Sequence, residues 1–218
     1  MLQYFQTTTM ILAWSIGLSF CWAVAVFLLP ARFSPRKKTI NRQIILPTLL
    51  FAPIVLFLFH KYLNINLIFP VVSISNIESI LLATLAPSVV LCFATGLFFS
   101  ITLEVRTLKE TFYASNFATF YKALGLSLKR KMFKLILSKS MIDCWKVSLP
   151  WIFGEIIIVE ALFNAHGLGL EIWHAARMRD LENFSVNIAW LMTMYVVLGA
   201  VASFLSKRMG ERLSDYGV

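Results

Sequence analysis

The amino-acid sequence predicts an all-α integral membrane protein with about five transmembrane helices. Hydrophobic residues make up 59% of the 218 positions and charged residues only 14%, whereas soluble domains are about half apolar and a quarter charged. The apolar residues gather in stretches of roughly 20, the length that spans a hydrocarbon layer about 30 Å thick. Basic residues gather between these stretches. We therefore expect the bilayer to be the solvent of this chain.

The basic residues also predict an orientation. Seventeen of the 20 Lys and Arg residues lie in three clusters, within residues 32–42, 106–146 and 207–212. Because positively charged loops stay in the cytoplasm, an odd number of spans places the N-terminus outside and the C-terminus inside. The net charge of +9 is thus explained by topology, and we expect no nucleic-acid partner.

Five apolar stretches define the predicted spans, and residues 1–218 form one transmembrane domain. The spans are expected at about 8–30, 44–60, 79–103, 147–163 and 185–205, with a cytoplasmic loop at about 105–146. The first is longer than a signal-peptide core of about 7–15 residues, so we expect a retained helix. Pro47 and Pro53 should bend or open the second span, because proline removes a backbone donor. Residues 64–76 and 164–184 are interpreted as external loops.

The cytoplasmic loop carries the pattern of two short amphipathic helices joined at Gly125. In the first, apolar side chains recur at the i, i+3, i+4 and i+7 positions of one face; they are Phe117, Phe120, Tyr121 and Leu124. Ser127 is expected to cap the second helix, whose surface is rich in Lys and Arg. The pattern is typical of helices that lie on lipid headgroups or of an aromatic face that docks into a groove on a cytoplasmic protein.

Two acidic residues lie inside the fourth span, where a carboxylate is costly unless it faces protein, water or a cation. Glu155 and Glu160 are five residues apart, which separates them by about 140° around a helix. One interpretation places one or both on a translocation path. The other makes Glu160 a packing or loop-anchoring residue near the outer end of the span, hydrogen-bonded to backbone.

No sequence motif for nucleotide binding or hydrolysis is present. The chain has no G-x-x-x-x-G-K-[ST], no H-E-x-x-H, no C-x-x-C and no G-x-S-x-G, the usual signals for P-loop phosphate binding, metal catalysis and serine hydrolysis. Any ATP-driven role therefore needs a partner chain. We expect no cofactor in this chain, with ATP and Mg²⁺ bound by that partner, and no metal site.

The end of the fourth span and the residues after it resemble a known family. Residues 154–160 read G-E-I-I-I-V-E, residues 161–169 read A-L-F-N-A-H-G-L-G, and residues 175–180 read A-A-R-M-R-D. This looks like the C-terminal part of the dipeptide, oligopeptide and nickel permeases of ABC importers, in which V-V-V-E precedes F-x-x-x-G-L-G and then A-R-D. The resemblance runs from about residue 85 to 212 and is most specific at 160–169.

The resemblance implies a type I importer permease in a bacterial inner membrane. Its partners would be ABC ATPase subunits, a second permease subunit and an extracytoplasmic solute-binding protein, and its cargo a peptide, a metal or a metal chelate. The coupling helix that contacts the ATPase would be formed by Phe117, Thr119, Phe120, Tyr121, Leu124 and Gly125. Candidate residues of the translocation path or outer gate are Glu155, Glu160, Phe163, Gly167 and Gly169.

This chain also departs from the family pattern. Of the family's E-A-A-x-x-x-G coupling pattern only the glycine, Gly125, is kept, and bulky Phe120 and Tyr121 replace small residues. We expect no counterpart within residues 1–218 of the extra N-terminal span and large external domain of peptide permeases. A non-transporting membrane anchor or scaffold for a cytoplasmic complex is the alternative function. An intramembrane enzyme that uses Glu155 and Glu160 as acid and base is disfavoured by their angular separation.

Overall fold

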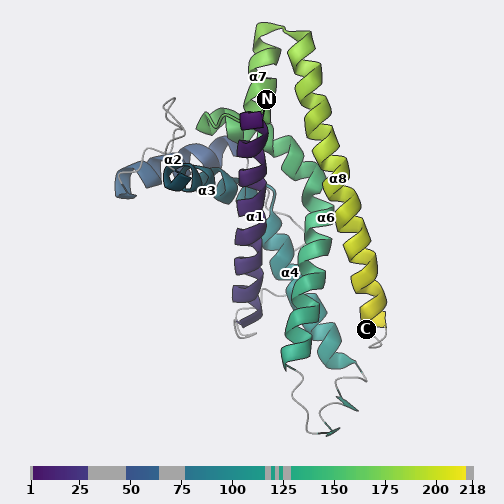
Figure 1. Ribbon diagram of the computed structural model, residues 1–218. Coiled ribbons are helices and arrows are strands. Elements are labelled where there is room, and N and C mark those ends of the chain that lie inside the picture. The colour runs from purple at the N-terminus through teal and green to yellow at the C-terminus, as the bar shows by residue number, and fades with distance from the viewer. Residues whose placement is uncertain are drawn as a thin grey trace. The chain divides into compact units, whose positions relative to one another are not determined.

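The computed structural model describes residues 2–28, 48–63, 77–115, 119–120, 123–124 and 129–214, and every regular element within these ranges is helical. Figure 1 shows the helices in chain order. They are α1 (Leu2–Leu28), α2 (Thr48–Leu63), α3 (Ile77–Ala94), α4 (Leu97–Ala114), α6 (Lys129–Phe163), α7 (Leu168–Met178) and α8 (Leu181–Ser214). The predicted all-α class is confirmed for the part of the chain that is described.

Two helices are long and apolar enough to cross a membrane by themselves. They run over Tyr4–Leu28 in α1 and Leu181–Glu211 in α8. Two further pairs pass the same test only when joined across a bend: Thr84–Ala94 with Leu97–Ala114, bent by 60°, and Phe133–Phe163 with Leu168–Met178, bent by 78°. The described residues therefore supply two candidate spans, or up to four if each bent pair is one. The number of five and the orientation stay predictions.

The chain divides into two compact units. One contains Met1–Leu18, Ile45–Gly96 and Leu149–Val197, and the other contains Ser19–Ile44, Leu97–Ser148 and Leu198–Val218. The helices α1, α6 and α8 contribute residues to both. Each unit has its own buried apolar residues.

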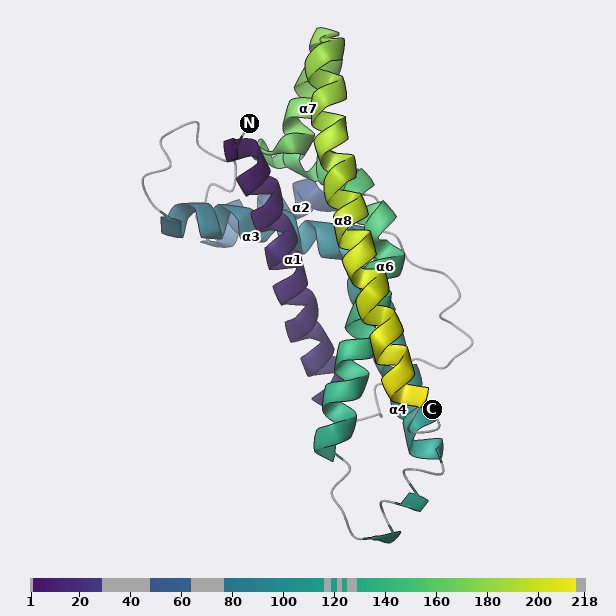
Figure 2. The same ribbon diagram turned by 45° about the vertical axis from the view of Figure 1, so that its right-hand side comes forward.

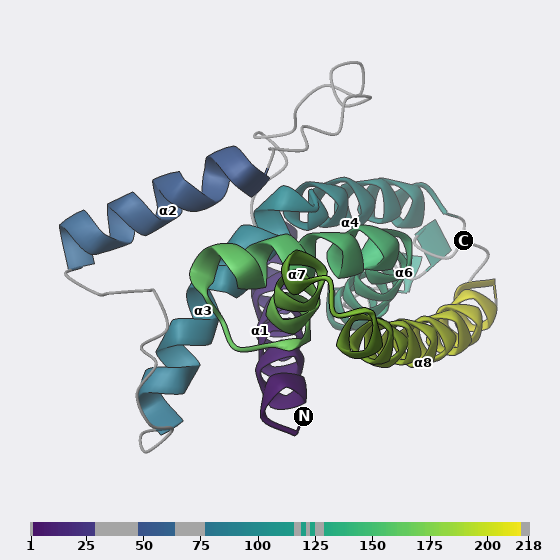
Figure 3. The same cartoon turned by 90° about the horizontal axis from the view of Figure 1, so that it is seen from above.

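The first unit is built around the crossing of α1 and α3. Figures 1 and 3 show α3 reaching the side of α1, where the Ser88 hydroxyl donates to the Ile11 carbonyl at 3.0 Å. α2 contacts α3, with the rings of Phe51 and Phe93 5.3 Å apart. Figure 2 shows α7 and the first turns of α8 running antiparallel to each other. Buried aliphatic side chains of α6, among them Ile152 and Ile156, complete this core.

The second unit joins the end of α1 to α4 and α6. The Trp22 indole N–H lies 3.0 Å from the Phe98 carbonyl and 3.0 Å from the Thr102 hydroxyl. The Lys109 ammonium donates to the Phe27 carbonyl at 3.2 Å, which satisfies one of the carbonyls left free at the end of a helix. The Phe27 ring packs edge-on against Phe133 of α6, with centroids 5.0 Å apart.

The predicted third span is interrupted. Residues 79–103 were expected as one helix, but α3 ends at Ala94 and α4 begins at Leu97. Gly96 between them has φ +66°, a conformation that glycine adopts at no steric cost. A hydropathy pattern does not detect the break, because Leu97 and Phe98 beyond it are apolar and buried.

No helix begins or ends at the predicted boundary between the cytoplasmic loop and the fourth span. α6 is one helix of 35 residues from Lys129 to Phe163, so the second amphipathic helix expected after Ser127 is its first part and is not separate. Pro150 lies inside this helix with its side chain exposed. The expected external loop at 164–184 likewise contains the 11-residue helix α7. Pro47 and residues 64–76 lie outside the described residues.

Candidate functional site

Glu160 is the most deeply buried acidic side chain that the structure describes, with no exposed surface. It lies near the end of α6, and its carboxylate faces the start of α7. Oε2 accepts hydrogen bonds from the backbone N–H groups of Gly169 at 2.7 Å and Leu170 at 3.3 Å. Oε1 accepts one from the Thr8 hydroxyl at 2.7 Å. The carboxylate is thus held by three donors from two helices.

Thr8 connects the same carboxylate to the first residue of α7. Its side chain is fully buried, and its hydroxyl oxygen accepts the Leu168 N–H at 2.9 Å. The first backbone N–H groups of a helix have no partner within that helix. Here Thr8 and Glu160 supply the acceptors for three of them, and the negative charge lies at the positive end of the α7 dipole. We name Thr8, Glu160 and the backbone of residues 168–170 the α7 anchor.

The two glycines of the predicted outer turn have a steric role in this anchor. A Cβ atom on Gly167 would clash with the carboxylate of Glu160. A Cβ atom on Gly169 would lie 2.7 Å from the Ile157 Cα and 3.0 Å from Glu160 Oε2. Real Cβ atoms do not approach backbone as closely as a Cβ on Gly169 would, so that position requires glycine. At Gly167 the clash is with the end of a side chain, and a Cβ there would displace the Glu160 carboxylate from the anchor. The Ala165 N–H closes the turn on the Glu160 carbonyl at 2.9 Å.

Glu155 lies at a different place from Glu160. It is half-buried and accepts a hydrogen bond from the hydroxyl of Thr48, the buried first residue of α2. The two carboxylates on α6 therefore hold the starts of two different helices, as their angular separation of about 140° requires. Phe163, another predicted gate residue, is fully buried. The anchor brings together Glu160, Gly167 and Gly169 but does not include Glu155.

The predicted coupling helix is described only in part. Phe120 and Leu124 are 61% and 55% exposed, and the Leu124 N–H donates to the Phe120 carbonyl at 3.1 Å in a helical pattern. The exposed Thr119 donates its N–H to the Ser115 carbonyl at 3.3 Å. Phe117, Tyr121 and Gly125 lie outside the described residues. The described part of the segment therefore presents two apolar side chains away from the protein.

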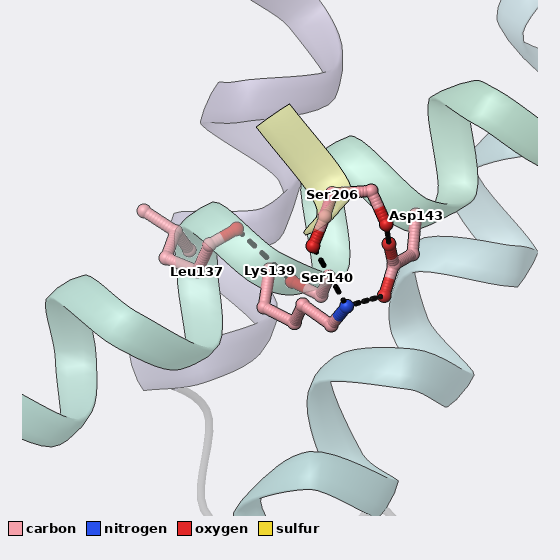
Figure 4. A network of polar contacts seen from close by, with 5 residues as sticks. All are labelled: Leu137, Lys139, Ser140, Asp143 and Ser206. Carbon is pink, nitrogen blue, oxygen red and sulfur yellow. Dashed lines mark hydrogen bonds and ion pairs between the residues drawn. The ribbon is translucent and has the colours of Figure 1, made fainter. Parts of the chain in front are cut away.

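A polar network in the second unit ties α6 to α8 (Figure 4). The Lys139 ammonium and the Asp143 carboxylate form an ion pair at 2.9 Å, one helical turn apart on α6. The Ser206 hydroxyl donates to Asp143 at 2.6 Å, and Lys139 also donates to the Ser206 carbonyl at 3.4 Å. Each of the three residues contacts the other two through an ion pair or a hydrogen bond. Together these contacts fix the position of α8 along α6.

Sequence reasoning missed Thr8, Thr48 and this network. A threonine inside an apolar helix gives no signal by itself, because its hydroxyl can bond to a carbonyl of its own helix. The Thr8 hydroxyl indeed lies 3.2 Å from the Tyr4 carbonyl oxygen. The pairing of Lys139 with Asp143 could have been found from their i, i+4 spacing. No sequence pattern indicates that Ser206 joins them from 63 residues away.

The comparison with protein families and that with curated proteins each found no match. Within the ranges that the structure describes, no three His, Cys, Asp or Glu side chains gather as metal ligands.

Proposed function

We propose that this protein is the permease subunit of an ATP-driven importer of the ABC type, in a bacterial inner membrane. The observation that carries the proposal is the short exposed helical segment after α4, in which Phe120 and Leu124 project from the protein. An apolar pair one helical turn apart, next to the basic start of α6, suits docking into a groove on a cytoplasmic subunit. The chain's own sequence has no phosphate-binding loop, so the ATPase is a separate chain.

The continuous helix α6 supports a route for coupling. It begins at Lys129, nine residues after Phe120, and ends at Phe163, next to the α7 anchor. A straight helix of 35 residues is about 52 Å long, longer than the bilayer. In our proposal, ATP-driven movement of the docked segment displaces α6, and α6 carries α7 with it through Glu160. Alternating movement of α7 would then open and close the outer end of the path.

The path residues are part of the same proposal. Glu155, Glu160, Phe163, Gly167 and Gly169 belong to the gate, with Glu160 acting by fixing α7 and not by binding the solute. The cargo class stays a small solute such as a peptide, a metal or a metal chelate. A second permease subunit and a solute-binding protein complete the assembly that the sequence resemblance implies.

The docking role is tested by adding charge to the exposed pair. The double variant Phe120→Glu with Leu124→Glu, and the control Ala114→Glu at an exposed position of α4, are purified from native membranes. We expect the unsubstituted chain and the control to co-purify with a subunit that contains a P-loop and hydrolyses ATP. The double variant should remain in the membrane and lose that subunit. Retention of the ATPase by the double variant would remove the basis of the proposal.

A non-transporting anchor for a cytoplasmic complex is the second candidate. It is favoured by the full engagement of Glu160, since a carboxylate with three protein donors has little capacity left for a solute. The two functions differ in one measurement. An importer reconstituted with its ATPase hydrolyses ATP faster when the solute and its binding protein are added, whereas an anchor shows no such dependence.

A further inference from the structure

The turn between α7 and α8 exposes large apolar side chains to an unusual extent. Met178 is 77% exposed and Leu181 is 78% exposed, the highest fractions among the large hydrophobic residues described, and Trp173 one turn earlier is 53% exposed. We name residues 173–182 the hairpin tip. Water contact with so much apolar surface is unfavourable, so the tip should have an apolar neighbour.

The hairpin tip also carries two arginines without a carboxylate partner. Arg177 and Arg179 are exposed, and none of the described acidic residues pairs with either. Asp180, which follows Arg179 in the chain, accepts hydrogen bonds from the backbone N–H and the side-chain amide of Asn183 at 3.1 and 2.6 Å. These hydrogen bonds hold the pKa of Asp180 below its usual range. Two guanidinium groups therefore lie free beside the apolar side chains.

The backbone of the tip is fixed. Arg179 adopts the left-handed conformation at φ 57°, and its N–H bonds to the Ala176 carbonyl at 3.3 Å. The Asp180 N–H bonds to the Ala175 carbonyl at 2.9 Å. The helix end is thus closed in the way typical of a left-handed C-cap. Any partner of the tip meets a preformed surface.

The length of α8 places the hairpin tip at the level of the lipid headgroups. Arg208 lies over the exposed ring of Phe204, 4.7 Å from its centroid, and Lys207 and Arg208 are the first basic residues along α8, as expected where a helix leaves the hydrocarbon. Counting back from Lys207, a layer about 30 Å thick takes about 20 residues. Leu181 then lies about 7–9 Å beyond the opposite hydrocarbon boundary, for tilts up to about 20°. The headgroup layer of one leaflet is about 5–8 Å deep.

We propose that the hairpin tip is a lipid-binding surface that lies in the headgroup layer of the leaflet opposite the C-terminal end of α8. Arg177 and Arg179 bind phospholipid phosphodiesters, which match the planar guanidinium fork. Trp173, Met178 and Leu181 reach toward the acyl chains, where tryptophan is commonly found at membrane interfaces. Anionic phospholipids bind best, because neither arginine forms an ion pair with Asp180 or Glu182, the two acidic residues of the tip. The inference rests on α8 crossing the bilayer and does not depend on any ATPase.

A lipid surface fits the tip better than a protein partner does. Stable protein interfaces bury about 800 Å² on each side, and one turn with three apolar side chains offers much less. The apolar and charged groups also lie close together on one turn, the arrangement of an interfacial anchor.

The test measures the depth of the tip in vesicles. An environment-sensitive fluorophore is attached at Met178→Cys in the full chain, which also carries Cys21→Ala. The matched depth control carries the probe at Val196→Cys, in the middle of α8. The chain with neither Met178→Cys nor Val196→Cys corrects for labelling of Cys92 and Cys144. Vesicles consist of phosphatidylcholine alone or mixed with phosphatidylglycerol. Spin labels are placed on the lipid headgroup or in the middle of the acyl chain, and iodide reports water exposure.

We expect the probe at 178 to be quenched most by the headgroup label and the probe at 196 by the mid-chain label. Phosphatidylglycerol should shield the 178 probe further from iodide. Arg177→Gln with Arg179→Gln should lower the ratio of shielded to exposed probe by about fivefold for each arginine in those vesicles and leave the 196 probe unchanged. Full iodide access to the 178 probe in both lipids would overturn the proposal. Shielding that occurs only when an external partner protein is added would equally overturn it, in favour of a protein surface.

Discussion

Replacing Glu160 should separate the role of its hydrogen bonds from that of its shape. In Glu160→Ala the buried N–H groups of Gly169 and Leu170 and the Thr8 hydroxyl all lose their acceptor. A buried donor without a partner costs about 1–3 kcal/mol. Because Thr8 can bond to the Tyr4 carbonyl instead, two donors are stranded. Together with the cavity, the expected loss of stability is about 3–5 kcal/mol.

Glu160→Gln should cost much less, for a reason visible in the geometry. The amide oxygen can still accept the Gly169 N–H, and the amide nitrogen can donate to the Thr8 oxygen once the hydroxyl proton turns to Tyr4. Only the interaction of a charge with the α7 dipole is lost, about 1 kcal/mol. Thr8→Val removes the acceptor of the Leu168 N–H and should cost about 2 kcal/mol.

The assay is unfolding of the purified full chain in detergent micelles, followed by tryptophan fluorescence and by proteolysis within the segment from α7 to α8. Thr9→Val is the matched control, because Thr9 is only half-buried and its hydroxyl bonds only within α1. The variants Thr8→Val and Glu160→Gln should also show a coupling free energy in a double-mutant cycle. If Glu160→Ala is no less stable than Glu160→Gln, the anchor is not held by these hydrogen bonds.

Three further outcomes are expected. Gly169→Ala should destabilise the chain by roughly 2 kcal/mol or more, because the new Cβ clashes with backbone. In the control Gly154→Ala the new Cβ meets nothing within 4 Å, so that variant should be neutral or stabilised by up to about 1 kcal/mol. Equal stabilities of the two variants would contradict the steric argument. Ser206→Ala should cost about 1 kcal/mol and increase hydrogen exchange at the end of α8, and unchanged exchange there would count against the network. Because the pKa of Asp180 is lowered in the folded protein, its cap on α8 is present above the ordinary value of 3.8 and is lost as the pH falls through the lower folded value. The protection of the Asn183 amide against exchange, taken relative to its intrinsic rate at each pH, should fall only in that acid window.

The parts of the fold that follow from composition were predictable. Uninterrupted apolar length decides whether a helix can cross a bilayer, so the positions of α1 and α8 could be inferred from hydropathy alone. The starts and ends of helices were less predictable. The break at Gly96 depends on one dihedral angle, and the continuity of α6 through its basic first part is hidden, because a charged segment next to an apolar one has the hydropathy of a loop.

The candidate site was half predictable for a related reason. The cost of burying a carboxylate pointed to Glu160, and anchoring to backbone was one of the two interpretations. Its partner Thr8 could not be inferred, because the contact joins residues 152 positions apart and depends on how α1 meets α7.

The long separation between Thr8 and Glu160 has a consequence for biosynthesis. At a synthesis rate of about 5–20 residues per second, the carboxylate emerges roughly 8–30 s after the hydroxyl that binds it. During this interval α1 stays in the membrane without its partner, and the Thr8 hydroxyl can bond to the Tyr4 carbonyl, 3.2 Å away. The Thr8 hydroxyl therefore has a hydrogen-bond acceptor when the first helix inserts. The anchor forms later, when this hydroxyl rotates from the Tyr4 carbonyl to the Glu160 carboxylate. A chain truncated before α7 should consequently be inserted but remain incompletely folded, because Glu160 then lacks its backbone donors.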